Sequence, residues 1–133
     1  MARSNNARPQ QGVVLLETLV AILIFSVGVL GIVGLQAAMV KNVAESKFRS
    51  EASYIAQARI GQIWADPENV ATYLETDTNI STQLPGGKRT VTQPTAGEFV
   101  VTVKWRLPGE TDPAKPNYQP ERNFTTNVRV TGG

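Results

Sequence analysis

The sequence predicts an α+β protein in which a long amino-terminal α-helix, with a membrane half and an amphipathic half, packs on a small antiparallel sheet of three or four strands. Three observations support this fold class. Residues 13–35 are predominantly apolar and carry a single charge, Glu17, and apolar residues then recur at helical spacing until Asp66 and Pro67. The last third of the chain contains segments in which apolar and polar residues alternate, as they do in strands.

The apolar segment is long enough to cross a membrane. Its 23 residues carry one charge, and as an α-helix they would reach about 35 Å. The hydrocarbon core of a bilayer is about 30 Å thick. A carboxylate near the amino end of such a segment costs about 2.5 to 3.5 kcal/mol on insertion scales. We therefore expect Glu17 to have a dedicated partner.

The segment before it, residues 1–12, is a short basic leader. It is polar and contains Arg3 and Arg8 but no acidic residue, so it should stay on the cytoplasmic side of the membrane. An ordinary secretory signal has a shorter apolar core followed by a small-x-small cleavage site, which residues 36–38 match poorly. A cut at Gly12 would instead keep the apolar segment in the mature protein.

The order of these features resembles the class III signal of type IV pilins and pseudopilins. The basic leader ends in Gly12, apolar Val13 follows, Glu17 is the fifth residue after the glycine, and an unbroken apolar helix comes next. The resemblance implies a pilin-like fold and a membrane peptidase, the prepilin peptidase, that cuts between Gly12 and Val13 and N-methylates Val13. It also implies an assembly role for Glu17. Family members more often carry Phe or Met in place of Val13.

Within that family, residues 16–36 are most similar to the minor pilins called PilV, the type IV pilus modification proteins. The resemblance covers about the first half of the chain, to Gln57. It implies the division of the chain into a leader at 1–12, a transmembrane and filament-core helix at 13–35, an amphipathic half at 36–65 and a periplasmic sheet domain at 66–133.

The helical pattern continues beyond residue 35. Apolar residues recur at three- and four-residue steps between charged ones; they are Val40, Val43, Ala44, Phe48, Ala52, Ile55 and Ile63. Because the residue before proline is pushed out of the helical region, Asp66-Pro67 is a natural stop. We expect one continuous helix of about fifty residues, with the hydroxyls of Thr18 and Ser26 bonded to carbonyls one turn back.

Three glycines, Gly28, Gly31 and Gly34, interrupt the apolar segment at three-residue steps. One interpretation is close packing against other helices. The other is a locally soft helix that loosens when subunits pack into a fibre. No Gly-x-x-x-Gly pair occurs here, so the common membrane dimer motif is not met.

The last part of the chain predicts a small sheet. Strands are expected at 88–93, 98–107 and 124–130, with a connecting loop at 66–87 that contains a short helical turn at 70–74. Alternation places Phe99, Val101, Val103 and Trp105 on one face, which should cover the apolar stripe of the helix from Val43 to Ile63.

Residues 108–122 contain four prolines. A segment of this length is too long for a tight hairpin. Two interpretations remain: a protruding contact loop with Tyr118 as its aromatic anchor, or a solvated excursion.

Two possible ligand-binding motifs are incomplete. The series Asp77, Asn79, Ser81 suggests a calcium loop, but Thr82 stands where the EF-hand needs glycine, and the twelfth position is Lys88 rather than glutamate. The Gly-Gly-Lys series at 86–88 lacks the earlier glycine of a phosphate-binding loop. Residues 85–87 are better interpreted as a turn.

Composition excludes several functional classes. The formal net charge is +2, but loss of the leader removes two of 13 basic residues and balances the remainder against 11 acidic ones, so no nucleic-acid partner is expected. The chain has no cysteine and no histidine, which removes thiolate and imidazole metal ligands and His-dependent nucleophiles. We expect no enzyme activity, cofactor or metal site.

The leading hypothesis is a minor pilin, a structural subunit in the bacterial inner membrane with a periplasmic carboxyl-terminal domain, later drawn into a pilus filament at the cell surface. Its partners would be the prepilin peptidase, other major and minor pilins and inner-membrane lipid. Two alternatives are a minor pseudopilin of type II secretion, of the small I-type, and an unprocessed membrane-anchored periplasmic binding domain.

Overall fold

The computed structural model describes residues 8–110 and 112–131. Residues 1–7 of the expected leader, including Arg3, lie outside the described residues. The elements are α1 (Arg8–Ala65), a short 3₁₀ helix η1 (Val70–Tyr73), and strands β1 (Glu75–Asn79), β2 (Lys88–Thr95), β3 (Glu98–Trp105) and β4 (Arg122–Arg129). The chain divides into two units, residues 1–42 and 43–133, and α1 has residues in both.

The predicted continuous helix is confirmed. α1 has 58 residues; it begins at Arg8, before the expected start at Val13, and its last residue, Ala65, directly precedes Asp66-Pro67. The two predicted hydroxyl contacts are also present. Thr18 donates to the carbonyl of Val14 at 2.8 Å and Ser26 donates to that of Ile22 at 2.7 Å, which satisfies both hydroxyls without any partner outside the helix.

The first unit is a helix with bare apolar side chains. Val13, Phe25 and Leu30 are 65%, 72% and 70% exposed in the isolated chain. The helix is long and apolar enough to cross a membrane. Since a helix satisfies its own backbone hydrogen bonds, hydrocarbon is a solvent in which such a surface is stable.

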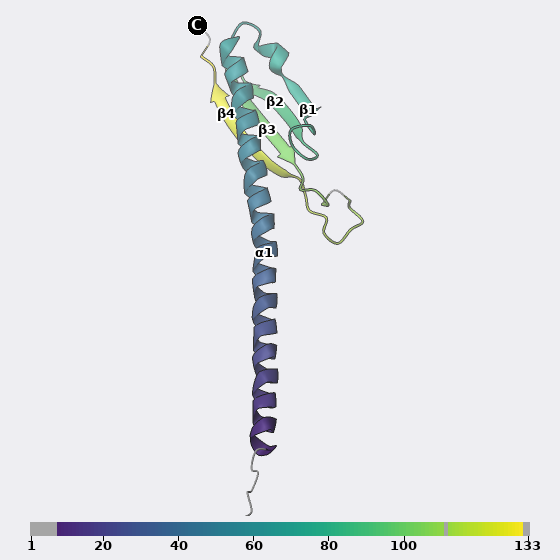
Figure 1. The fold of residues 1–133 in the computed structure, drawn as a ribbon. Helices are drawn as coiled ribbons and strands as arrows, with labels where there is room; N and C mark the ends of the chain where they lie inside the picture. Colours follow the sequence, from purple (N-terminus) through teal and green to yellow (C-terminus); the bar gives the residue numbers. More distant parts are fainter. Residues whose placement is uncertain (1–7, 111, 132–133) are drawn as a thin grey trace, which may run out of the picture. The chain divides into compact units, whose positions relative to one another are not determined.

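The second unit contains a four-stranded antiparallel sheet in the order β1-β2-β3-β4 (Figure 1). The three strands expected from alternation are observed as β2, β3 and β4. The expected helical turn is η1. The prediction that residues 66–87 form only a helical turn and a loop was wrong, because they include β1. The sequence of β1, Glu-Thr-Asp-Thr-Asn, has no apolar residue from which alternation could be read.

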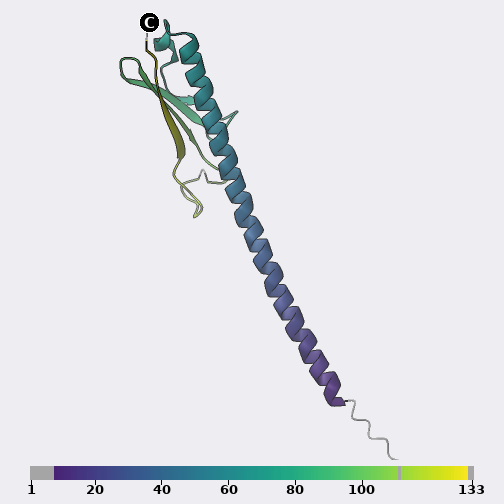
Figure 2. The ribbon, with the colours of Figure 1, turned by 90° about the vertical axis from the view of Figure 1, so that its left-hand side faces the viewer.

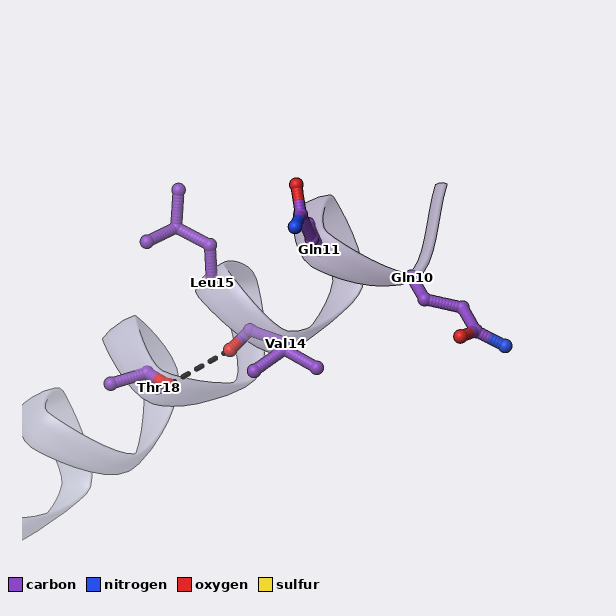
Figure 3. Close-up of a pocket in the computed structure, with 5 residues that line it drawn as sticks. All are labelled: Gln10, Gln11, Val14, Leu15 and Thr18. Atoms are coloured by element: carbon purple, nitrogen blue, oxygen red, sulfur yellow. Dashed lines mark hydrogen bonds between the residues drawn. The ribbon is translucent and has the colours of Figure 1, made fainter. Parts of the chain in front are cut away.

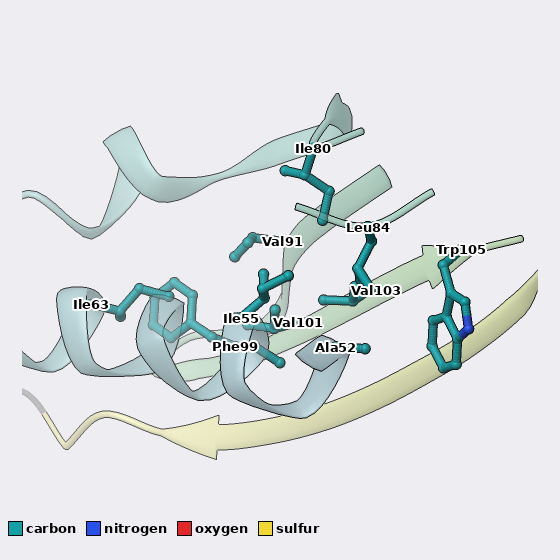
Figure 4. Packing of buried hydrophobic residues seen from close by; sticks show 11 residues of the cluster. Ala52, Ile55, Ile63, Ile80, Leu84, Val91, Phe99, Val101, Val103 and Trp105 are labelled. Atoms are coloured by element: carbon teal, nitrogen blue, oxygen red, sulfur yellow. The ribbon is translucent and has the colours of Figure 1, made fainter. Parts of the chain in front are cut away.

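One face of the sheet packs against α1, as both Figure 1 and Figure 2 show. The buried residues of the helix, the sheet and the loop between β1 and β2 form one cluster (Figure 4); its members are Ala52, Ile55, Ala56, Ile63, Ile80, Leu84, Val91, Phe99, Val101, Val103 and Trp105. All four residues predicted to face inward from the second expected strand are among them. Two fully buried alanines on α1 let the helix approach the sheet closely.

The predicted start of the helix–sheet contact was wrong. Val43 is 68% exposed, and the first helix residue packed against the core is Phe48, which is half-buried. Val40 and Val43 follow the same helical spacing as the buried residues, but their part of α1 extends past the residues that cover it. Periodicity predicts which side of the helix is apolar and leaves open how far along it the sheet reaches.

The turn between β2 and β3 depends on Gly97. Its φ is +79°, and a Cβ built there would lie 2.9 Å from the carbonyl oxygen of Val130. The carbonyl of Gly97 accepts a hydrogen bond from the Val130 amide at 2.7 Å. Both the backbone conformation and the closeness of the neighbouring chain therefore require glycine.

We expect Gly97→Ala to lower the free energy of unfolding by about 1 to 3 kcal/mol, because alanine is strained at this φ and its methyl group meets Val130. Gly61→Ala is the matched control. Gly61 lies in α1 with open space around its Cβ, so alanine there should raise stability by up to about 1 kcal/mol. Urea titration of the detergent-solubilised protein, followed by tryptophan fluorescence, measures both. Equal stability of the Gly97 variant and wild type would contradict this account of the turn.

Candidate functional site

The candidate processing and assembly residues lie on successive turns at the amino end of α1. Gly12, Val13 and Glu17 are all helical and all exposed. Since residues four apart in a helix lie on one face, Val13 and Glu17 share a side. α1 alone orients all three side chains.

Gly12 has no packing role in the described chain. A Cβ at this position would meet no atom within 4 Å, and the residue is in a helix, where glycine costs about 1 kcal/mol relative to alanine. Nothing among the described residues explains why alanine is absent here. Other glycines of α1 are equally open, namely Gly28, Gly31, Gly34 and Gly61, so what distinguishes Gly12 is its position before Val13 and Glu17.

The charge of Glu17 also has no compensating partner among the described residues. No hydrogen bond or ion pair joins its carboxylate to any residue that the structure describes. The neighbouring Leu16, Leu19 and Val20 are exposed apolar side chains. A carboxylate in such a surface is costly in lipid unless it gains a partner. The dedicated partner expected from the sequence is not within the described part of this chain.

A surface hollow lies beside these residues, lined by Gln10, Gln11, Val14, Leu15 and Thr18 (Figure 3). Every described lining residue belongs to α1, so the described residues form a wall on one side only. Small-molecule sites are concave and enclose most of their ligand. This hollow suits contact with a second surface and not enclosure of a small ligand.

Within residues 8–110 and 112–131, no group of three histidine, cysteine, aspartate or glutamate side chains could hold a metal ion. The side chain of Asn79 accepts from the Ser81 amide at 2.8 Å, as in an Asx turn. The predicted turn at 85–87 is confirmed, with the Gly87 amide donating to Leu84 at 2.9 Å.

Sequence reasoning missed an ion-pair cluster between α1 and the β1 side of the sheet. Arg89 makes a two-pronged contact with Glu75, and Nε of Arg59 lies 3.2 Å from the same carboxylate. Arg59 also lies over the ring of Tyr73, 5.1 Å from its centroid. The side chains of Arg59, Glu75 and Arg89 are 13% to 18% exposed. The cluster joins α1, β1 and β2 at one side of the core.

A second cluster lies where β4 begins. Arg122 donates to Glu110 at 2.6 Å and to Glu45 of α1 at 3.3 Å. Glu110 is the one buried charged residue in the part of the chain that the structure describes. Hydrogen bonds to charged groups are the stronger ones, so this cluster attaches both the helix and the 108–122 segment to β4.

The proline-rich segment has further attachments. Arg106 lies over the ring of Tyr118, 5.0 Å from its centroid, and Asn117 donates to the carbonyl of Gly109 at 2.8 Å. Residues 112–117 are exposed, and Figure 1 shows the segment extending beyond the ends of β3 and β4. Tyr118 therefore anchors the loop to its own sheet. The structure leaves no exposed aromatic in 112–117 that could serve as a contact.

Searches of protein-family models, curated proteins and solved structures give no match to this chain. The residues themselves are therefore the basis for assigning a function.

The Glu75 cluster predicts a pH dependence of stability. Burial disfavours the ionised carboxylate, but hydrogen bonds from Arg89 and Thr78, with the charges of Arg89 and Arg59, outweigh it and hold the pKa of Glu75 below its usual value. The resulting stabilisation is present above the unfolded pKa of about 4.3. It is lost as the pH falls through the folded pKa.

We expect Glu75→Gln to be less stable than wild type at pH 7, because two guanidinium groups lose their carboxylate, and to lose less stability on acidification. Urea titrations at a series of acidic pH values measure both effects. Glu68→Gln, at an exposed position, should behave as wild type. Parallel pH dependences for wild type and Glu75→Gln would show that this cluster contributes nothing.

Proposed function

We propose that this chain is a minor pilin: a structural subunit that a prepilin peptidase cuts between Gly12 and Val13 and methylates at Val13, and that then enters a type IV pilus. The observation that carries the proposal is the spacing of two residues: Glu17 is the fifth residue after Gly12, at the start of an exposed apolar helix. Each is unfavourable where it lies, one in a helix and the other in an apolar surface, and neither is compensated by a contact with any described residue. Recognition by a peptidase and pairing in an assembly supply the two missing reasons.

Cleavage would give Glu17 its complementary charge. The new amine of Val13 is a cation in an apolar setting, and Glu17 of the same or a neighbouring subunit is an anion. At an effective dielectric constant of about 20, opposite charges 4 Å apart attract by about 4 kcal/mol before desolvation. Apolar side chains pack in many registers, whereas such a pair favours one. Glu17 would therefore select the register between subunits.

The bare apolar surface of residues 13–35 supports the same assignment. It is suited to lipid while the subunit is stored in the inner membrane, and to the helices of other major and minor pilins once it enters the filament. The sheet of the second unit would then be periplasmic and later lie at the surface of the pilus. The subunit would act on pilus assembly or adhesion.

Intact mass of the membrane-extracted protein, expressed with and without an active prepilin peptidase, tests the proposal. For wild type we expect loss of residues 1–12 and a gain of one methyl group, only when the peptidase is present. Gly12→Val should keep its leader. Gly31→Val is the matched control, since both glycines lie in α1 with open space around them, and it should be processed as wild type.

Glu17→Gln separates processing from assembly, because it should still lose its leader but be depleted from sheared filaments in a piliated host. An intact wild-type amino terminus, beside another pilin that the same peptidase has cut, would overturn the proposal. The chain would then be an unprocessed membrane-anchored domain.

A further inference from the structure

The sheet has two edge strands, and they differ in how they are protected. β1 has five residues, a register shift between Glu75 and Thr78, and a positive φ of 47° at Asp77. Short length and bulges are devices by which natural sheets prevent other strands from pairing with their edges. β1 is therefore a blunted edge.

β4 has none of these protections. It has eight residues, without proline or lysine, and its register with β3 is unbroken from Arg122 opposite Trp105 to Arg129 opposite Glu98. A long, regular edge strand presents a row of backbone donors and acceptors to any extended chain. β4 is therefore an open edge.

The register identifies which backbone groups face outward. The Val130 amide donates to Gly97, on the β3 side. Along an antiparallel strand, successive residues direct their backbone groups to opposite sides. Since the register is constant, even-numbered residues of β4 bond to β3. Asn123, Thr125, Asn127 and Arg129 present their N–H and C=O groups to the free edge.

Side chains beside this edge favour acidic partners. A hollow between α1 and β4 is lined by three serines (Ser46, Ser50 and Ser53) together with Arg49 and Phe124. The guanidinium of Arg49 has no partner among the described residues, and the same holds for the exposed Arg129 at the other end of β4. Positive charge therefore lies near both ends of the open edge; Glu98 is the cross-strand neighbour of Arg129, but no ion pair joins the two among the described residues.

A second copy of this chain is a poor occupant. β4 of a second copy contains two arginines and no carboxylate, so pairing with it would add positive charge at the edge and give Arg49 and Arg129 no opposite charge. The β1 edge of another copy is bulged, and its Glu75 is already held by Arg59 and Arg89. Neither edge of a second copy provides free carboxylates on a regular strand.

We propose that the free edge of β4 accepts an extended segment of a different polypeptide, one that carries carboxylates, as a fifth strand of the sheet. Backbone hydrogen bonds to the four outward-facing residues supply affinity. Arg49 and Arg129 supply the preference for acidic side chains. This proposal does not require leader cleavage or entry into a pilus, so the two can fail separately.

The probe is a fluorescein-labelled peptide of the same length as β4, with alternating valine and threonine and a glutamate near each end. Fluorescence anisotropy measures its binding to the full chain in zwitterionic detergent micelles. Replacing both glutamates by lysine should weaken binding by about tenfold or more. N-methylation of alternate peptide amides should do the same, because it removes donors needed for pairing without changing the protein.

Two protein variants complete the test. Asn127→Pro removes one outward N–H and leaves the bonds to β3 in place, so it should weaken binding by about tenfold. Asn127→Ala keeps that N–H and should bind as wild type. Saturation with the glutamate peptide should slow amide hydrogen exchange at Thr125 and Asn127 and leave Thr126 and Val128, already bonded to β3, unchanged.

Equal affinity for the glutamate, lysine and N-methylated peptides would overturn the proposal. Unchanged exchange at Thr125 and Asn127 under saturation would do so as well, since binding would then lie elsewhere on the protein.

Discussion

The packing of α1 against one face of the sheet is the contact on which the rest of the structure depends. Ala52 and Ala56 are fully buried beneath Phe99 and its strand neighbours, and burial of apolar surface at about 25 cal/mol per Å² is the main favourable term available to a chain without disulfides. This packing gives the sheet one dry face and one wet face. It also determines which part of α1 is covered within the chain and which part must find its cover in lipid or in other proteins.

Two ion-pair clusters lie on either side of that core. Arg59, Glu75 and Arg89 hold one side of the sheet to α1, while Arg122 joins Glu45 to Glu110 at the start of β4. Partly buried ion pairs contribute little net stability, and breaking one of them is costly. Their consequence here is geometric: apolar side chains allow the sheet to slide along the helix, and the clusters favour one position. β4 is an edge strand because of the strand order, in which it pairs with β3 alone.

The sequence predicts those parts of the molecule that depend on local pattern. Helical spacing and Asp66-Pro67 were sufficient for the continuity and the end of α1, though not for its start at Arg8, and alternation was sufficient for β3 and its inward-facing residues. β1 was missed because it has no apolar residue; its backbone pairs with β2 and its Glu75 contacts Arg89, neither of which a local pattern shows. The Arg122 contact with Glu45 joins residues 77 apart in the chain, a separation that no local pattern encodes. The candidate processing residues, Gly12 and Val13, were proposed from their order along the chain, and the proposed role requires molecules outside it.

The central claim is that the two halves of α1 have different surroundings, lipid for residues 13–35 and the sheet for the second half. Accessibility of single cysteines to a membrane-impermeant maleimide in spheroplasts tests it most directly, since the chain has no cysteine of its own. We expect Tyr54→Cys, 70% exposed, to be labelled at once. Leu23→Cys should react only after detergent is added, and Ala52→Cys, fully buried, only after unfolding. Rapid labelling of Leu23→Cys in the intact membrane, or protection of Tyr54→Cys until lysis, would contradict the claim.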